Sequence, residues 1–238
     1  MKTTLKASLF AVLTLAATTA PAANYADATG EGPIVSSNPH LDITSVEVNN
    51  TASDLIFKIN LVGDPVGTDW GKYMIGIHTG SGGDPAGNGW GRPISIPTGM
   101  NYWLGSWVDS GNGVQLYAYS GSWSQIGGAG TFAGGPVLPG LSISKTTSSV
   151  TITAPFASMG LGFGNTINFD VYTSGGGGGD SAIDALANPG QAAADWGTPY
   201  ASQTTDAYTI QAVPEPAACV LLGFGGLLMF ERVLRRRF

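Results

Sequence analysis

The chain has 238 residues and a formal net charge of −6 at pH 7, and only 11% of its residues are charged. Six of the ten basic residues lie near the two ends, so the segment 23–213 holds fourteen acidic residues against four basic ones, a formal charge of −10. Such a surface repels nucleic acid and anionic lipid, which excludes nucleic-acid binding. The single cysteine, Cys219, lies outside this segment, so the segment has neither a disulfide nor thiol chemistry.

The N-terminal segment has the pattern of a secretory signal peptide. Two lysines precede an apolar stretch over 7–17, and Ala20-Pro21-Ala22 forms an A-x-A site that predicts cleavage before Ala23. A second A-x-A site at 26–28 leaves the position of the cut open by several residues. We therefore expect residues 1–22 to be a signal peptide that directs export through the Sec machinery.

Short apolar runs separated by Gly, Asp and Asn turns predict an all-β body, and the 36 glycines agree with this. Alternating apolar residues predict strands over 41–48, 55–61, 73–77, 150–152, 167–171 and 208–210. In the first of these the apolar positions change parity between Ile43 and Val46, which predicts a bulge near Thr44-Ser45. Short helical turns are expected within 154–164 and 181–187. The fold class that follows is a single antiparallel β-sandwich, jelly-roll-like, over residues 23–212.

A β-hairpin is predicted in the middle of the chain. Residues 101–108 and 114–120 flank the turn-rich loop 109–113, and a five-residue loop pairs Val108 with Val114. This register places Leu104 opposite Ala118 on an aliphatic face suited to the core. It places Trp103 opposite Tyr119, Gly105 opposite Tyr117, and Trp107 opposite Gln115 on the other face.

The second face of the hairpin is the candidate glycan-binding site, formed by Trp103, Trp107, Tyr117 and Tyr119. Aromatic planes with nearby amide and carboxylate groups suit carbohydrate recognition, because pyranose faces stack on the rings while rim hydroxyls form hydrogen bonds. The alternative is that these rings pack beneath a second sheet or a long loop such as 121–140, since large aromatic residues are usually buried. Trp90, in a Gly-rich loop after His78, either lines a ligand cleft or caps the sandwich end.

No catalytic motif is recognisable, and we expect a non-enzymatic protein without a cofactor. His40 and His78 have no partner at metal-ligand spacing, and no nucleophile elbow or phosphate-binding loop is present. Asp180 and Asp184 follow a run of five glycines and are considered as a calcium site, although they lack the D-x-[DN]-x-[DN]-G spacing. Among other acidic residues, Asp42, Asp54 and Asp170 are interpreted as solvated or turn-capping groups at strand borders.

The C-terminal segment 213–238 has the layout of a processing signal. It contains Pro214-Glu215-Pro216, an apolar run over 217–230, and three arginines near its end, Arg235, Arg236 and Arg237. As a helix, the run spans roughly 21 Å, less than the roughly 30 Å hydrocarbon core of a bilayer. The arginines favour the cytoplasmic side, which predicts transient inner-membrane anchoring with the N-terminus outside and the C-terminus inside. The alternative is an ordinary C-terminal anchor.

These C-terminal residues resemble the PEP-CTERM sorting signal, which exosortase processes in Gram-negative bacteria that make extracellular polysaccharide. The resemblance implies an exosortase-like processing partner and a location at the cell envelope, at the cell surface or outside the cell. It covers about a tenth of the chain and implies nothing about what the rest of the protein does.

The body is also similar, at the level of strand pattern, to the DOMON-type or family-9 carbohydrate-binding-like β-sandwich. The similarity lies in the runs 41–48, 54–59 and 73–77 and in the segment 180–196. This resemblance implies a sandwich that binds sugars or a haem, and no binding residue is assigned from it.

We therefore expect an exported, non-catalytic module that contacts exopolysaccharide. One alternative is a structural surface or biofilm-matrix protein without a specific ligand. Another is a polysaccharide-acting hydrolase, which requires two carboxylates facing each other across a cleft.

Overall fold

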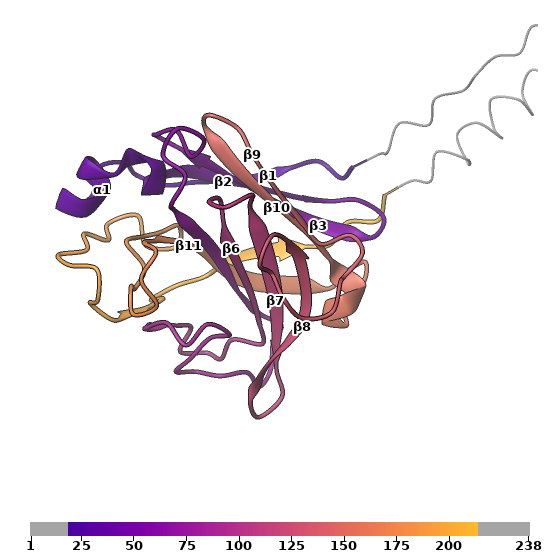
Figure 1. The fold of residues 1–238 in the computed structure, drawn as a ribbon. Coiled ribbons are helices and arrows are strands. Elements are labelled where there is room, and N and C mark those ends of the chain that lie inside the picture. The colour runs from indigo at the N-terminus through magenta and orange to yellow at the C-terminus, as the bar shows by residue number, and fades with distance from the viewer. Residues whose placement is uncertain (1–18, 214–238) are drawn as a thin grey trace, which may run out of the picture. The chain divides into compact units, whose positions relative to one another are not determined.

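The computed structural model describes residues 19–213 (Figure 1), and most of its regular structure is β-strand. One sheet has five strands in the order β1 (Ala23–Ala26), β2 (Ile43–Asn50), β3 (Asp54–Leu61), β10 (Ser149–Pro155) and β9 (Ser142–Lys145). The other has seven strands: β12 (Asp184–Ala185), β11 (Thr166–Ser174), β4 (Lys72–His78), β6 (Tyr102–Trp107), β7 (Gly113–Tyr119) and β8 (Trp123–Gly130), with β14 (Asp206–Thr209) also paired to β11. All strand pairs in both sheets are antiparallel.

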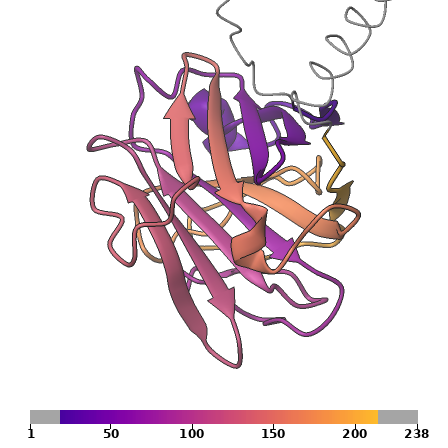
Figure 2. The same cartoon turned by 90° about the vertical axis from the view of Figure 1, so that its right-hand side faces the viewer.

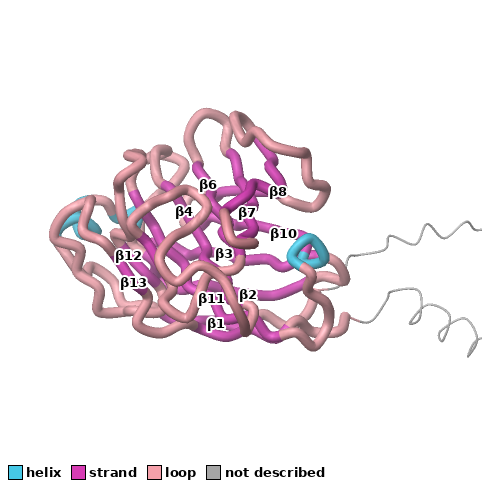
Figure 3. Tube along the Cα trace, turned by 90° about the horizontal axis from the view of Figure 1, so that it is seen from below, coloured by secondary structure: helices cyan, strands magenta, loops and turns pink. Residues whose placement is uncertain are grey.

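The remaining elements are short. The strands β5 (Ile94–Ser95) and β13 (Tyr200–Ala201) form a separate parallel pair. Helix α1 (Pro33–Ser37) and the 3-10 turns η1 (Pro39–Leu41) and η2 (Phe156–Met159) lie at the ends of the sandwich, where Figure 3 shows them in cyan. The β7–β8 hairpin projects at the lower edge of the molecule in Figures 1 and 2.

The two sheets pack face to face over the main core. In β3 every second residue is buried, and Phe57 meets Phe169 of β11 with ring centroids 5.4 Å apart. The same core contains Ile75 and Ile77 of β4 and Leu104 of β6. Alternation at period two thus supplies one apolar face from each sheet, as a sandwich requires.

The sequence prediction of an all-β antiparallel sandwich is confirmed. Four of the six single strands predicted lie within β3, β4, β10 and β11, and the other two overlap β2, which begins at Ile43, and β14, which ends at Thr209. The predicted bulge is also present, because the β2–β3 register shifts between Ile43 and Ser45. A 3-10 turn occurs within 154–164, but the turn expected over 181–187 is wrong, since strand β12 lies there.

The hairpin forms, but its predicted register is wrong, because the loop begins one residue earlier than predicted. Trp107 pairs with Gly113, so the five-residue loop is 108–112, and Leu104 pairs with Leu116. The physical reason lies at Gly113, where a Cβ would be 2.1 Å from the Trp107 ring, so the indole lies flat over the glycine. Because the partners shift by two residues, each side chain keeps the predicted face.

The seven-stranded sheet is buried on both faces along β11, β4 and β6. Its outer face carries Met74, Trp103 and Tyr172, which pack in a second apolar cluster against residues from the loops 79–101 and 175–205. This cover explains why five consecutive residues of β4 are buried. The alternating pattern predicted instead that one side of this strand faces solvent.

Candidate functional site

The loop 79–101 covers the outer face of β6 through Trp90. A Cβ on Gly105 would lie 2.3 Å from the Trp90 ring, so the indole rests directly on the strand backbone. Trp90 Nε1 donates to Gln115 Oε1 at 2.7 Å. The loop is held in turn by Asn88, whose side-chain amide donates to the carbonyls of Arg92 and Ile94, both at 2.8 Å. These contacts make Trp90 a fixed cover.

Trp103 lies beneath this cover and is fully buried. Its ring stacks against Tyr172 at 6.0 Å with an interplanar angle of 23°, and meets Trp90 at 6.2 Å and 66°. The interpretation of Trp103 as part of an exposed stacking surface is therefore wrong. The cover is the loop 79–101, whereas the sequence analysis considered the loop 121–140 for that role.

The other three candidate aromatics are half-buried. Trp107 lies over Gly113 and beside Trp90, at a centroid distance of 6.3 Å. Tyr117 lies under the loop as well, because a Cβ on Gly89 would be 2.5 Å from its ring, and burial raises the pKa of the Tyr117 hydroxyl. The structure therefore separates the candidates into a covered side and an open side.

The open side is the β7–β8 hairpin, where Tyr119 lies opposite Trp123. Their ring centroids are 5.4 Å apart at 54°, and both side chains are partly exposed. Trp123 Nε1 donates to Asp84 Oδ2 at 2.9 Å, which fixes the indole. We refer to these two residues as the hairpin aromatic pair.

Trp123 is a site residue that the sequence does not predict. A loop was expected over 121–140, and four glycines lie within 121–130, yet 123–130 forms β8. Gly127 and Gly128 approach Leu138 and the Gly134 carbonyl so closely that a Cβ would lie 2.6 Å and 2.3 Å away. The only signal was the spacing of Trp123 and Gln125 on one face of a period-two strand.

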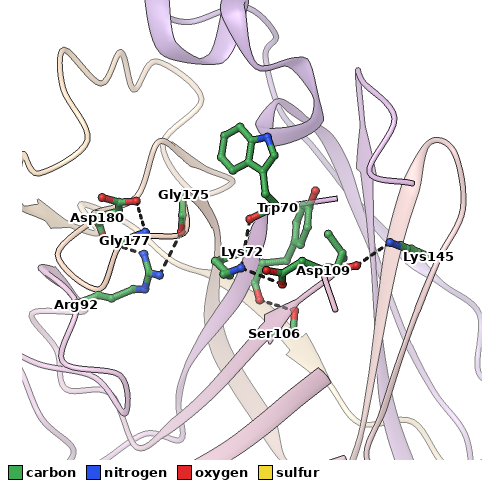
Figure 4. A network of polar contacts seen from close by, with 11 residues as sticks. Trp70, Lys72, Arg92, Ser106, Asp109, Lys145, Gly175, Gly177 and Asp180 are labelled. Carbon is green, nitrogen blue, oxygen red and sulfur yellow. Dashed lines mark hydrogen bonds and ion pairs between the residues drawn. The ribbon is translucent and has the colours of Figure 1, made fainter. Parts of the chain in front are cut away.

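Every basic side chain within residues 19–213 has a protein partner. Lys58 pairs with Glu47 at 2.8 Å and Lys72 with Asp109 at 3.1 Å. Lys145 donates to the carbonyl of Val108. Arg92 is buried, and Figure 4 shows it among the glycines of the 175–179 run.

Arg92 joins the two loops that cover the seven-stranded sheet. Its guanidinium donates to the carbonyls of Asp180 and Gly175 at 3.0 and 3.2 Å (Figure 4). A further donation goes to Ser174 Oγ at 2.8 Å. It also lies 5.4 Å from the centroid of the Trp90 ring. A planar group with several donors suits this position because it satisfies carbonyls on one loop while stacking on the other.

Asp180 and Asp184, considered together as a calcium site, have different surroundings. Asp180 is partly exposed and its Oδ2 accepts a hydrogen bond from the Gly177 N–H at 2.8 Å. Asp184 is buried and belongs to a group of three carboxylates with Glu31 and Asp42, in which Asp180 has no part. The sequence analysis missed Glu31 and Asp42, because nothing in their spacing relates them to Asp184.

The interpretation of three strand-border aspartates is correct for one of them. Asp54 accepts hydrogen bonds from the hydroxyls of Thr51 and Ser53, as a turn-capping group does. Asp42 and Asp170 are not solvated, with exposures of 3% and 0%. Both lie where the sandwich is covered by loops, which the strand pattern does not reveal.

The sorting-signal residues Pro214, Glu215, Pro216, Arg235, Arg236 and Arg237, the apolar run 217–230 and most of the signal peptide lie outside the described residues. Within 19–213, no helix has the length and apolar character needed to cross a membrane. In comparisons with known proteins, no family, no curated protein and no solved structure matches this chain.

Proposed function

We propose that this protein is an exported, non-catalytic β-sandwich that contacts neutral polysaccharide at the cell surface through the hairpin aromatic pair. The observation that carries the proposal is the placement of Tyr119 and Trp123 side by side, partly exposed, on a hairpin that projects from the sandwich (Figure 2). Export and exosortase-like processing rest on the two terminal sequence patterns alone.

The chemistry of the hairpin supports a sugar ligand. Two rings offer apolar surface on which pyranose faces stack, and Asp84 keeps the Trp123 indole in place before any ligand arrives. Gln125 follows Trp123 on the same face of β8, and its side-chain Nε2 donates to the carbonyls of Ala133 and Gly134, which steadies the strand beside the pair. The acidic surface, with its basic side chains already paired, disfavours anionic polymers and so points to a neutral glycan.

The alternative is a structural surface or matrix protein without a specific ligand. The burial of Trp103 favours it, because the exposed aromatic surface is smaller than the sequence indicated. The two functions differ in whether soluble glycan binds at a defined place. A binding experiment on the hairpin therefore separates them.

The test is affinity electrophoresis of residues 23–213 in gels that contain the producer's purified exopolysaccharide. This segment is suitable because residues 19–212 form one compact unit with its own core. We expect retardation of the wild type and its loss in the double variant Tyr119→Ala/Trp123→Ala, with unchanged circular dichroism.

The matched control is Phe163→Ala, which removes another half-exposed ring at a different place, next to Phe156. Retardation that persists in the double variant would refute the hairpin as the binding site. A wild type that is not retarded would favour the matrix protein.

A further inference from the structure

Three carboxylates meet at the end of the sandwich that carries helix α1. Glu31 precedes α1, Asp42 lies between η1 and β2, and Asp184 belongs to β12. One ligand oxygen from each of these three lies within 4.8 Å of the others. Asp27, directly after β1, lies outside this group but near it, since the charges of Asp184 and Glu31 act on its carboxylate.

Several oxygens at this carboxylate group lack hydrogen-bond donors. Asp42 is 97% buried; its Oδ2 accepts from the Gly30 N–H at 3.0 Å, but its Oδ1 has no partner among the described residues. The same holds for both oxygens of Glu31 and for Oδ2 of Asp27. Buried carboxylate oxygens are normally paired, because an unpaired one keeps its full desolvation cost.

No basic side chain of the described residues compensates this charge. Lys58, Lys72, Lys145 and Arg92 bond elsewhere. A bound cation would compensate these closely spaced carboxylates, whose unpaired oxygens have lost their contact with water.

The geometry suits a calcium-sized ion. Two oxygens that both bind Ca²⁺ at its usual distances of about 2.3–2.6 Å lie at most about 5 Å apart, which accommodates the 4.8 Å limit in this group. All the ligands are carboxylates, which hard cations prefer, and no thiol or imidazole joins them. Mg²⁺ retains several waters and demands octahedral geometry, so it fits a site built from protein carboxylates alone less well.

We infer that Glu31, Asp42 and Asp184 form a calcium-binding site that joins the N-terminal segment to β12, with the carboxylate of Asp27 beside it. The Ile43 N–H holds Asp184 Oδ2 at 2.7 Å and the Ala185 N–H holds Oδ1 at 2.8 Å, so that this ligand is positioned by the sheet. The ion would then fix the loop 27–31 onto this rigid carboxylate. The inference is independent of the proposed glycan binding.

The test uses residues 23–213, stripped with EDTA and then titrated with CaCl₂ alone by isothermal titration calorimetry and thermal melting. We expect one calcium per chain and a rise in Tm of roughly 5–10 °C at a hundredfold excess over Kd. MgCl₂ at equal concentration should give a smaller shift. Absence of both heat and Tm shift with calcium would overturn the inference.

Two variants locate the site. Glu31→Gln should weaken calcium binding at least tenfold, and Asp42→Asn should do the same if it folds. Glu31 lies in a loop with only partial burial, so its variant remains informative if Asp42→Asn does not fold. The matched control is Asp180→Asn, which removes a nearby acid in the sequence but outside the group, and should leave calcium affinity unchanged. Wild-type affinity in Glu31→Gln would overturn the assignment.

Discussion

Trp90 lies edge-on to Trp103 with ring centroids 6.2 Å apart, and this contact separates the buried part of the aromatic face from its open part. Because Trp103 is fully buried, we expect Trp103→Ala to lower the free energy of unfolding by about 3–5 kcal/mol. Trp123→Ala, at a partly exposed ring, should cost less than half of that. Urea unfolding followed by circular dichroism measures both, and equal losses would contradict the burial of Trp103.

Gly105 is required by the close approach of Trp90. In Gly105→Ala the new Cβ would lie 2.3 Å from Trp90 Cε2, so the indole must move and expose the cluster beneath it. We expect a loss of about 1–3 kcal/mol in unfolding free energy. Gly178→Ala is the matched control, since nothing lies within 4 Å of a Cβ there. Urea unfolding measures both variants, and an unchanged unfolding midpoint in both would show that Trp90 is not held on the strand.

Arg92 is expected to stabilise the loops far more than a surface cation does. Arg92→Met leaves the carbonyls of Gly175 and Asp180 without this donor, which should cost about 2–4 kcal/mol. Lys58→Met is the control, because its pair with Glu47 is more than one-third exposed on both sides and should contribute at most about 1 kcal/mol. Thermal melting at low and high salt compares them, and similar losses would refute the bridging role.

The stability of the calcium-free protein should fall as pH rises from about 4 to 7. Burial raises the pKa of Asp170 to about 7, whereas the unfolded side chain titrates near 4. Within this window the folded carboxyl binds a proton that the unfolded one has released, so rising pH favours unfolding. Asp27 and Asp184 act in the same direction.

The measurement is Tm in EDTA at pH 5.5 and pH 8. We expect a lower value at pH 8, and a smaller difference in Asp170→Asn, in which the amide cannot ionise. The N–H groups of Val171 and Ala187 donate to Asp170 Oδ1, so the asparagine oxygen can take that position. Its amide nitrogen then faces the Ser202 hydroxyl, which now donates to Oδ2 at 2.7 Å and can accept instead. A Tm that increases from pH 5.5 to 8 would contradict this prediction.

The sandwich could be predicted from sequence because its strands show the pattern of a half-buried sheet. Leu55, Phe57 and Ile59 alternate with Ile56, Lys58 and Asn60, and burial follows that alternation. The exact register of the hairpin could not be predicted, because a loop over 109–113 and a loop over 108–112 are equally long and place the same residues on each face. The packing of Trp107 over Gly113 decides between these two registers.

The sites were harder to predict for the same physical reason. Trp103 has the spacing of an exposed aromatic, but its burial depends on Trp90, which belongs to a loop with no periodicity. Glu31, Asp42 and Asp184 come from three separate segments that only the folded sheets bring together. Local patterns report which face a residue occupies, and not what covers that face.

The two A-x-A sites near the N-terminus predict mature chains that begin at Ala23 or at Thr29. These two chains should differ in stability. A chain that begins at Ala23 keeps β1, in which Tyr25 meets Phe169 at 5.2 Å and donates its hydroxyl to the carbonyl of Ala207 at 2.6 Å. A chain that begins at Thr29 loses these contacts and Asp27 with them.

We therefore expect the free energy of unfolding of residues 29–213 to be at least about 2 kcal/mol lower than that of residues 23–213. The shorter chain lacks a partly buried ring and the four residue pairs between β1 and β2. The shorter chain should also show a smaller rise in Tm with calcium. Tyr25→Ala in the longer chain is the control that separates the ring from the carboxylate: it should lose stability but keep the calcium response. Equal stability of the two chains would mean that β1 contributes nothing to the sandwich, and would leave both cleavage sites equally compatible with the fold.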